Sequence, residues 1–112
     1  CITVGPQIWI SGQIGVAPDS DFSPTLEEQS RTIMKKLDGI LEGAQSNKSD
    51  IVMCTILLAD ISDVKAFNEI YAEWLEGTIL PARAAYAVKD LPAGALVEVM
   101  VQAMRGSGVS KL

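Results

Sequence analysis

The hydrophobic positions of this chain follow two periodicities, and the first of them is that of a β-hairpin. Residues 2–4 and 8–10 are mostly β-branched and flank a Gly-Pro-Gln turn. The second arm of the hairpin is predicted to continue to Gly15. Two glycines in this arm, Gly12 and Gly15, indicate a β-bulge, a point where another group approaches the backbone closely, or a simple irregularity at the sheet edge. The residues alone leave all three interpretations open.

Two stretches repeat their apolar residues every three or four positions, which is the period of an amphipathic helix. The first helix is predicted to begin at Ser23 or Thr25, because Thr25 and Glu28 have the spacing of a capping box, and to end within residues 43–47. The second helix is predicted to be capped by Asp60 or Ser62. The two apolar stripes, which we interpret as core, consist of Leu26, Ile33, Leu37, Ile40, Leu41 and Ala44, and of Val64, Phe67, Tyr71, Trp74 and Leu75.

The remaining apolar runs predict three more strands. Residues 51–58 are apolar at nearly every position, as in a strand that is covered on both faces. Two helices in a chain this short can cover only one face, so we expect a second subunit to cover the other. Further strands are predicted at 84–88 and 96–104, and residues 106–108 are predicted to fray. This order of elements predicts an α+β fold, a two-layer α/β sandwich.

Composition narrows the class of protein. With 112 residues, of which 48% are hydrophobic, the chain is expected to form one soluble, globular domain. Its net charge of −5 does not favour nucleic acid as a partner, and its apolar runs are far shorter than the roughly 20 residues that cross a bilayer. The chain has no histidine and two cysteines, Cys1 and Cys54, so we predict no metal site and no cofactor. We expect a reducing compartment, the cytoplasm, with the mitochondrion as the alternative.

Two charged residues stand in the last two apolar runs. By the two-residue period of a strand, the valines around Glu98 face the helices and Glu98 faces the open side of the sheet. One interpretation is an ion pair between Arg83 and Glu98, within one chain or between two. The other is a ligand site, because the planar fork of arginine suits a small carboxylate and Gly12 and Gly94 leave room. Asn68, beside the stripe of the second helix, must satisfy its amide locally or serve a site.

These residues resemble, in order and spacing, the RidA (YjgF-like) family of enamine/imine deaminases, and the resemblance covers nearly the whole chain. The matching runs are Pro81-Ala82-Arg83-Ala84-Ala85-Tyr86, Leu91-Pro92 and Val97-Glu98-Val99, together with Ile10-Ser11-Gly12-Gln13-Ile14-Gly15, Leu57-Leu58-Ala59-Asp60 and Phe67-Asn68-Glu69-Ile70-Tyr71. The resemblance implies a chorismate-mutase-like mixed sheet with two helices on one face, assembled as a homotrimer with ligand clefts between subunits. It also implies hydrolysis of 2-aminoacrylate-type enamines, through their imine tautomers, to 2-oxo acids and ammonia.

The resemblance further implies a role for each site residue. Arg83 would hold the carboxylate of a small 2-imino or 2-oxo acid. Glu98 would hold and polarise the water that attacks the imine carbon. Ser11 and Gly12 would line the cleft, and Asn68 would support it from the second helix.

The chain departs from the family pattern in two places. Ala85 stands where many bacterial relatives have a cysteine, so no thiol can act there, although backbone groups at this position can still bind the water. The Gly-Pro-Tyr segment of the family is expected just before Cys1. Residues 1–112 are therefore predicted to form a single RidA-like domain without its N-terminal strand segment.

Two other classes of function stay open at this point. Some relatives are named endoribonucleases or translation inhibitors, but an acidic chain without histidine offers little for binding or cleaving RNA. A non-catalytic module could use Arg83 only to sense small carboxylates. Turnover separates this third function from deamination, because binding needs the arginine alone and hydrolysis also needs a positioned water.

Overall fold

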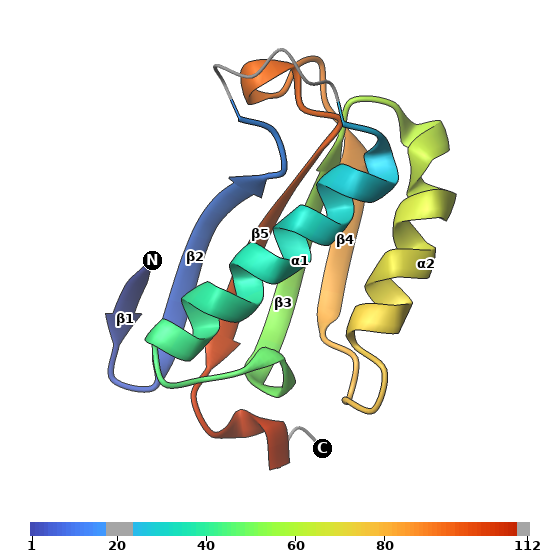
Figure 1. Ribbon diagram of the computed structural model, residues 1–112. Coiled ribbons are helices and arrows are strands. Elements are labelled where there is room, and N and C mark those ends of the chain that lie inside the picture. The colour runs from blue at the N-terminus through green and yellow to red at the C-terminus, as the bar shows by residue number, and fades with distance from the viewer. Residues whose placement is uncertain (18–23, 110–112) are drawn as a thin grey trace.

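The computed structural model describes residues 1–17 and 24–109, and there it shows a two-layer α+β fold, with two α-helices packed side by side on one face of a sheet (Figure 1). The sheet that these residues form has five strands in the order β1-β2-β5-β3-β4. The elements are β1 Ile2–Val4, β2 Gln7–Ile14, α1 Leu26–Gly43, β3 Ile51–Leu58, α2 Val64–Trp74, β4 Ala82–Ala87 and β5 Val97–Met104. The predicted fold class is confirmed.

The sheet is mixed because α2 joins β3 to β4 by a crossover that leaves these two strands parallel. β1, β2, β5 and β3 pair antiparallel, whereas β3 and β4 are parallel. Parallel neighbours need a crossover connection, and α2 supplies it between β3 and β4. As a result β4 lies at one edge of the sheet, with α2 packed beside it.

The first helix follows the sequence prediction closely. Thr25 is its N-cap, with the Glu28 amide donating to Thr25 Oγ1 at 3.2 Å and the Thr25 amide donating to Glu28 Oε1 at 3.0 Å. This capping box satisfies two backbone donors at the start of α1. The alternative start at Ser23 lies outside the described residues.

The second helix and the fourth strand differ from their predicted boundaries. Asp60 accepts a hydrogen bond from the Ser62 amide at 2.9 Å, but this caps a short 3₁₀ turn, Ile61–Asp63, that precedes α2. α2 itself begins at Val64 without a side-chain cap. β4 runs from Ala82 to Ala87, so it begins two residues and ends one residue earlier than predicted. It begins earlier because its pairing with β3 already starts at Ala82.

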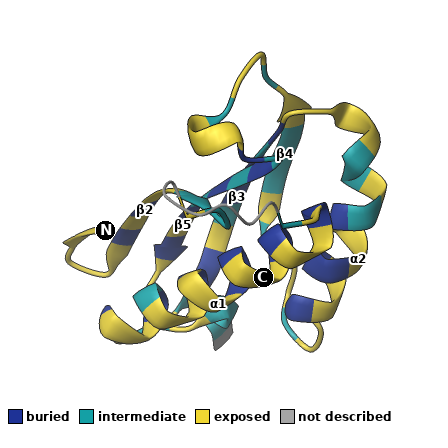
Figure 2. Cartoon of the chain, turned by 45° about the horizontal axis from the view of Figure 1, so that its top comes forward, coloured by how far each residue is buried: buried dark blue, intermediate teal, exposed yellow. Residues whose placement is uncertain are grey.

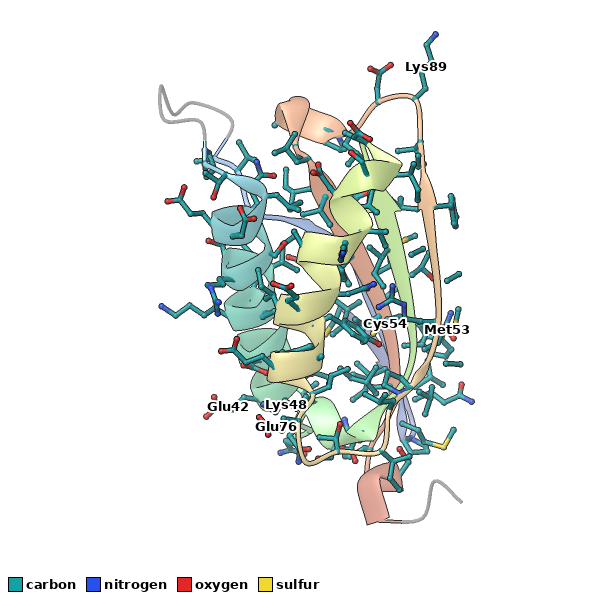
Figure 3. The ribbon with its side chains drawn as sticks, turned by 90° about the vertical axis from the view of Figure 1, so that its right-hand side faces the viewer. Glu42, Lys48, Met53, Cys54, Glu76 and Lys89 are labelled. Carbon is teal, nitrogen blue, oxygen red and sulfur yellow. The ribbon has the colours of Figure 1, made fainter. Side chains whose placement is uncertain are left out.

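The core lies between the helices and the sheet, where the inward positions of the strands alternate with outward ones (Figure 2). On β5 the side chains of Val97, Val99, Val101 and Ala103 are buried, as predicted, and those between them are not. On β3, Cys54 faces the helices and Met53 faces away from them (Figure 3). The face without helices therefore remains partly open in the single chain.

The predicted fraying of residues 106–108 is wrong, because hydrogen bonds hold this segment against the turn before β3. Asp50 accepts hydrogen bonds from the Ser46 hydroxyl at 2.6 Å and from the Gly108 amide at 3.0 Å. The Arg105 guanidinium donates to the carbonyl oxygen of Ala44 at 2.9 and 3.0 Å. These contacts join segments far apart in the sequence and stabilise the end of β5.

Asp50 makes this contact dependent on pH. Burial alone raises the pKa of Asp50, but hydrogen bonds from Ser46 and from the backbone of Gly108, Gly106 and Asn47 outweigh burial and hold the pKa below its ordinary value of 3.8. A carboxyl whose pKa is lowered by folding stabilises the fold above its unfolded pKa, and the contribution is lost as pH falls through the folded pKa.

We therefore expect Asp50→Asn to lower the free energy of unfolding at pH 7 by about 1–3 kcal/mol, because buried hydrogen bonds to a charged acceptor are lost. The difference from the parent protein should shrink as the pH falls below 3.8. Urea unfolding between pH 2.5 and 7 measures it, with the exposed Asp90→Asn as control. An unchanged stability at pH 7 would contradict the assignment.

Candidate active site

Arg83 lies on the helix side of the sheet edge. In the parallel register it is paired with Cys54 of β3, whose side chain is fully buried beneath the helices. Paired residues on neighbouring strands point to the same face of a sheet, so Arg83 also points toward the helices. Because β4 is an edge strand, the arginine is only half-buried.

The second helix holds the guanidinium of Arg83 with two side chains. Arg83 Nη2 donates to Asn68 Oδ1 at 2.7 Å, and the centre of the guanidinium lies 4.7 Å from the centroid of the Tyr71 ring. Asn68 and Tyr71 are three residues apart on α2, so they lie next to each other on one face of the helix. The amide oxygen of Asn68 thus has Arg83 as its hydrogen-bond partner.

Tyr71 is a site neighbour that sequence reasoning counted only as core. Burial raises the pKa of Tyr71, the neighbouring Cys54 adds to this rise, and Arg83 offsets only part of it. The ring therefore stays neutral near pH 7 and offers its electron-rich face to the guanidinium. The helical spacing from Asn68 was the available sequence signal, and it was read as packing.

Glu98 lies on the opposite, open face of the sheet. It is paired with Leu57 of β3 and with Ile14 of β2, and its side chain lies against Gly12. A Cβ atom added at Gly12 would lie 2.7 Å from Glu98 Cδ, so a larger residue would require the Glu98 side chain to shift. The strand also has a bulge between Ile10 and Gln13. The first two interpretations of the glycine pattern are therefore correct, with Glu98 as the approaching group.

Ser11 and Ala85 lie on opposite faces of the sheet. Ser11 is exposed and lines a hollow of about 380 Å³ on the open face, between Trp9 and Thr55. Ala85 is paired with the inward-facing Ile56, and its methyl group packs partly buried against the core. At Ala85 only the backbone is available for polar contacts.

Arg83 and Glu98 do not meet within one chain. Their partners on β3, Cys54 and Leu57, are three residues apart, and β4 and β5 flank β3 on either side. Standard strand spacings place their Cα atoms about 14 Å apart, with the side chains on opposite faces. The predicted ion pair within one chain is therefore wrong, and Asn68 and Tyr71 are the neighbours of Arg83 instead.

The open face is apolar over much of its area. Its strand positions alternate with the buried ones and carry Trp9, Met53, Leu57, Tyr86, Met100 and Met104. Trp9 is 39% exposed and Tyr86 is 49% exposed, although both are large aromatic residues. An exposed sheet face with this many large apolar residues is typical of an interface.

Residues 1–17 and 24–109 contain no group of three or more His, Cys, Asp or Glu side chains that could hold a metal ion. No helix in the same ranges has the length and apolar character needed to cross a membrane.

Comparisons with known proteins agree on one family. The family model described as endoribonuclease L-PSP matches residues 1–105. A rat protein named 2-iminobutanoate/2-iminopropanoate deaminase is 39% identical over 107 residues, which cover 94% of this chain and 77% of the rat protein.

Solved structures give the same result. The crystal structure of a putative endoribonuclease L-PSP from Entamoeba histolytica is 44% identical, with a TM-score of 0.83 over 91% of this chain and 82% of that one. The crystal structure of Escherichia coli TdcF with bound serine is 26% identical, with a TM-score of 0.85 over 94% of this chain and 85% of that one.

The two glycines at the end of β2 predict opposite outcomes. Gly12→Ala should change the free energy of unfolding by less than about 1 kcal/mol, because the partly exposed Glu98 side chain can move aside. Gly15→Ala should lower it by about 1–3 kcal/mol, because the added atom would lie 2.7 Å from the Gln29 Cα in the rigid backbone of α1. Urea unfolding of both variants tests this, and equal losses would contradict the described packing.

Proposed function

Since the chain belongs to the RidA (YjgF-like) family, we propose that it hydrolyses small 2-imino acids, the tautomers of 2-aminoacrylate-type enamines, to 2-oxo acids and ammonia. We propose further that the reaction takes place in clefts between the subunits of a homotrimer. The names of the rat and human relatives support the reaction, since both are 2-iminobutanoate/2-iminopropanoate deaminases. The serine bound by TdcF supports a ligand of similar size with a carboxylate.

The observation that carries the proposal is the state of Arg83. Its guanidinium is half-buried at a sheet edge and held by Asn68, and it is paired with no carboxylate within the described chain. A guanidinium in this position retains N–H donors for a planar carboxylate, which it binds with two parallel hydrogen bonds. A small 2-imino acid offers such a carboxylate next to its reacting carbon.

Two copies of the chain are needed to complete this site. Arg83 and Glu98 lie on opposite faces, about 14 Å apart by strand geometry, so one substrate cannot contact both within one chain. A cleft between subunits allows Arg83 of one copy to face Glu98, Gly12 and Ser11 of the next. Burial of the apolar open face would stabilise that assembly.

The reaction needs only groups that this chain contains. Arg83 would bind the substrate carboxylate and fix the imine carbon in place. Water would add to the carbon of the protonated imine while Glu98 accepts a proton, which gives a carbinolamine. Glu98 would return that proton to nitrogen, and the C–N bond would break as the hydroxyl group loses its proton to Glu98 and becomes the 2-oxo group. Ammonia leaves and the 2-oxo acid remains. Ala85 would contribute backbone groups to the bound water.

Cleavage of RNA is the competing function that the description of the family model raises. The net charge of −5 and the lack of histidine do not favour it. Degradation of a labelled RNA by the parent protein but not by Arg83→Ala or Glu98→Gln would favour it over deamination.

We expect the parent protein to accelerate pyruvate and ammonia release from enzymatically generated 2-aminoacrylate. Arg83→Ala should lower kcat/KM roughly 100-fold, because the charge-assisted bonds to the carboxylate are lost. Arg31→Ala is the matched control, since Arg31 lies on α1 and pairs with Glu73. If the parent protein binds 2-oxobutanoate but does not accelerate pyruvate release, the protein is a sensor of small carboxylates and not a deaminase.

The shared site predicts complementation between two impaired variants. Arg83→Ala and Glu98→Gln should each have strongly reduced activity alone, but random mixing by co-refolding should restore about one quarter of the sites, because half of the subunits carry each intact residue. The recovered pyruvate release is measured against the parent protein refolded in the same way. Absence of recovery in mixed assemblies would contradict a site built from two subunits.

A further inference from the structure

We infer that Tyr71 is a positioning residue for Arg83: its ring supports one face of the guanidinium and, together with Asn68, leaves one in-plane edge of that group for a ligand carboxylate. This inference rests on the proposed role of Arg83 as the carboxylate-binding residue.

The guanidinium of Arg83 is a planar group with two edges that can bind a carboxylate. Its N–H donors lie in one plane and point outward along its edges. The Tyr71 ring lies 4.7 Å from its centre, and Asn68 Oδ1 accepts from Nη2 at 2.7 Å. One N–H of Nη2 is therefore used, and whichever it is, one pair of adjacent N–H groups remains. A carboxylate bound there must lie in the guanidinium plane.

Packing fixes the ring of Tyr71 in this place. The ring is 5% exposed, and its centroid lies 5.8 Å from that of Phe67 on the same helix. Cys54, which is paired with Arg83 across the sheet, lies next to the tyrosine hydroxyl. That hydroxyl is buried beside Cys54 and Arg83. Tyr71→Phe, which removes only the hydroxyl, therefore separates the contribution of the ring from that of the hydroxyl.

A purely structural role for Tyr71 makes a different prediction from a positioning role. If Tyr71 only fills the core, any loss of a buried aromatic ring nearby should affect ligand binding equally. Phe67 is fully buried one turn away on the same helix, and its recorded ring contact is with Tyr71. Phe67→Leu is therefore the matched control for Tyr71→Leu.

The first experiment measures the mobility of Arg83 by ¹⁵N relaxation of its Nε–Hε group in the parent protein and in four variants. Tyr71→Phe should leave the order parameter unchanged, because it keeps the ring face. Tyr71→Leu should lower it clearly, whereas Phe67→Leu, which removes only a neighbour of the supporting ring, should lower it much less. Replacement of Tyr71 by pentafluorophenylalanine keeps the packing of phenylalanine but reverses the charge distribution of the ring, so it too should mobilise Arg83.

The second experiment measures the Kd for 2-oxobutanoate, a stable 2-oxo acid, and the kinetic constants for the imine. Tyr71→Leu and the pentafluoro variant should weaken binding and raise KM roughly tenfold, with kcat within about twofold, because the same contact is lost in the ground state and the transition state. Tyr71→Phe should restore parent values. Thermal melting of each variant confirms that the core is intact, and the pentafluoro variant covers the case in which Tyr71→Leu does not fold.

Two results would overturn the inference: an Arg83 that is equally ordered in all variants, or equal losses from Phe67→Leu and Tyr71→Leu. Failure of the proposed function gives a different pattern. If the parent protein does not bind 2-oxobutanoate, Arg83 is not the residue that binds the carboxylate. The relaxation data still decide, independently, whether Tyr71 positions the guanidinium.

Discussion

The alternation of side chains along the strands is the constraint on which the candidate site depends. Burial of Val97 and Val99 under the helices forces Glu98 to the open face, and burial of Cys54 sets Arg83, its partner in register, on the helix face. A one-residue shift of β5 that moved Glu98 to the helix face would place its charge in the core and expose the valines. The fold therefore keeps the two groups apart in one chain, and only a second copy can bring them together.

This separation links assembly to chemistry. The helix face supplies the arginine with Asn68 and Tyr71, so its orientation is decided within one chain. The open face supplies Glu98, and Gly12 leaves the space that this carboxylate occupies. In the proposed site, the helix face of one subunit carries Arg83 and the open face of another carries Glu98. Neither subunit therefore has to bury an ion pair between these two residues when it folds.

Much of the fold could be predicted from local sequence patterns, and the remainder depends on contacts distant in sequence. The capping box of Thr25 and Glu28 and the alternation along β5 lie within a few residues, so they were readable. The hydrogen bonds between Asp50 and Gly108 join residues with no shared pattern, and fraying was predicted in their place.

The sequence also does not show on which face of the sheet Arg83 lies. β4 is mostly alanine, which gives no alternation to read, so only its register with β3 assigns the faces. Tyr71 was missed because a core aromatic and a support for a guanidinium have the same helical spacing.

The central claim is that one ligand bridges groups from two subunits. The most direct test is a crystal structure of the assembled protein with 2-oxobutanoate bound. The account predicts the ligand carboxylate on the free edge of Arg83 from one subunit, with the 2-oxo group directed toward Glu98 of its neighbour. A ligand that contacts Arg83 with no neighbouring Glu98 in reach, or a protein that stays monomeric while it binds, would contradict it.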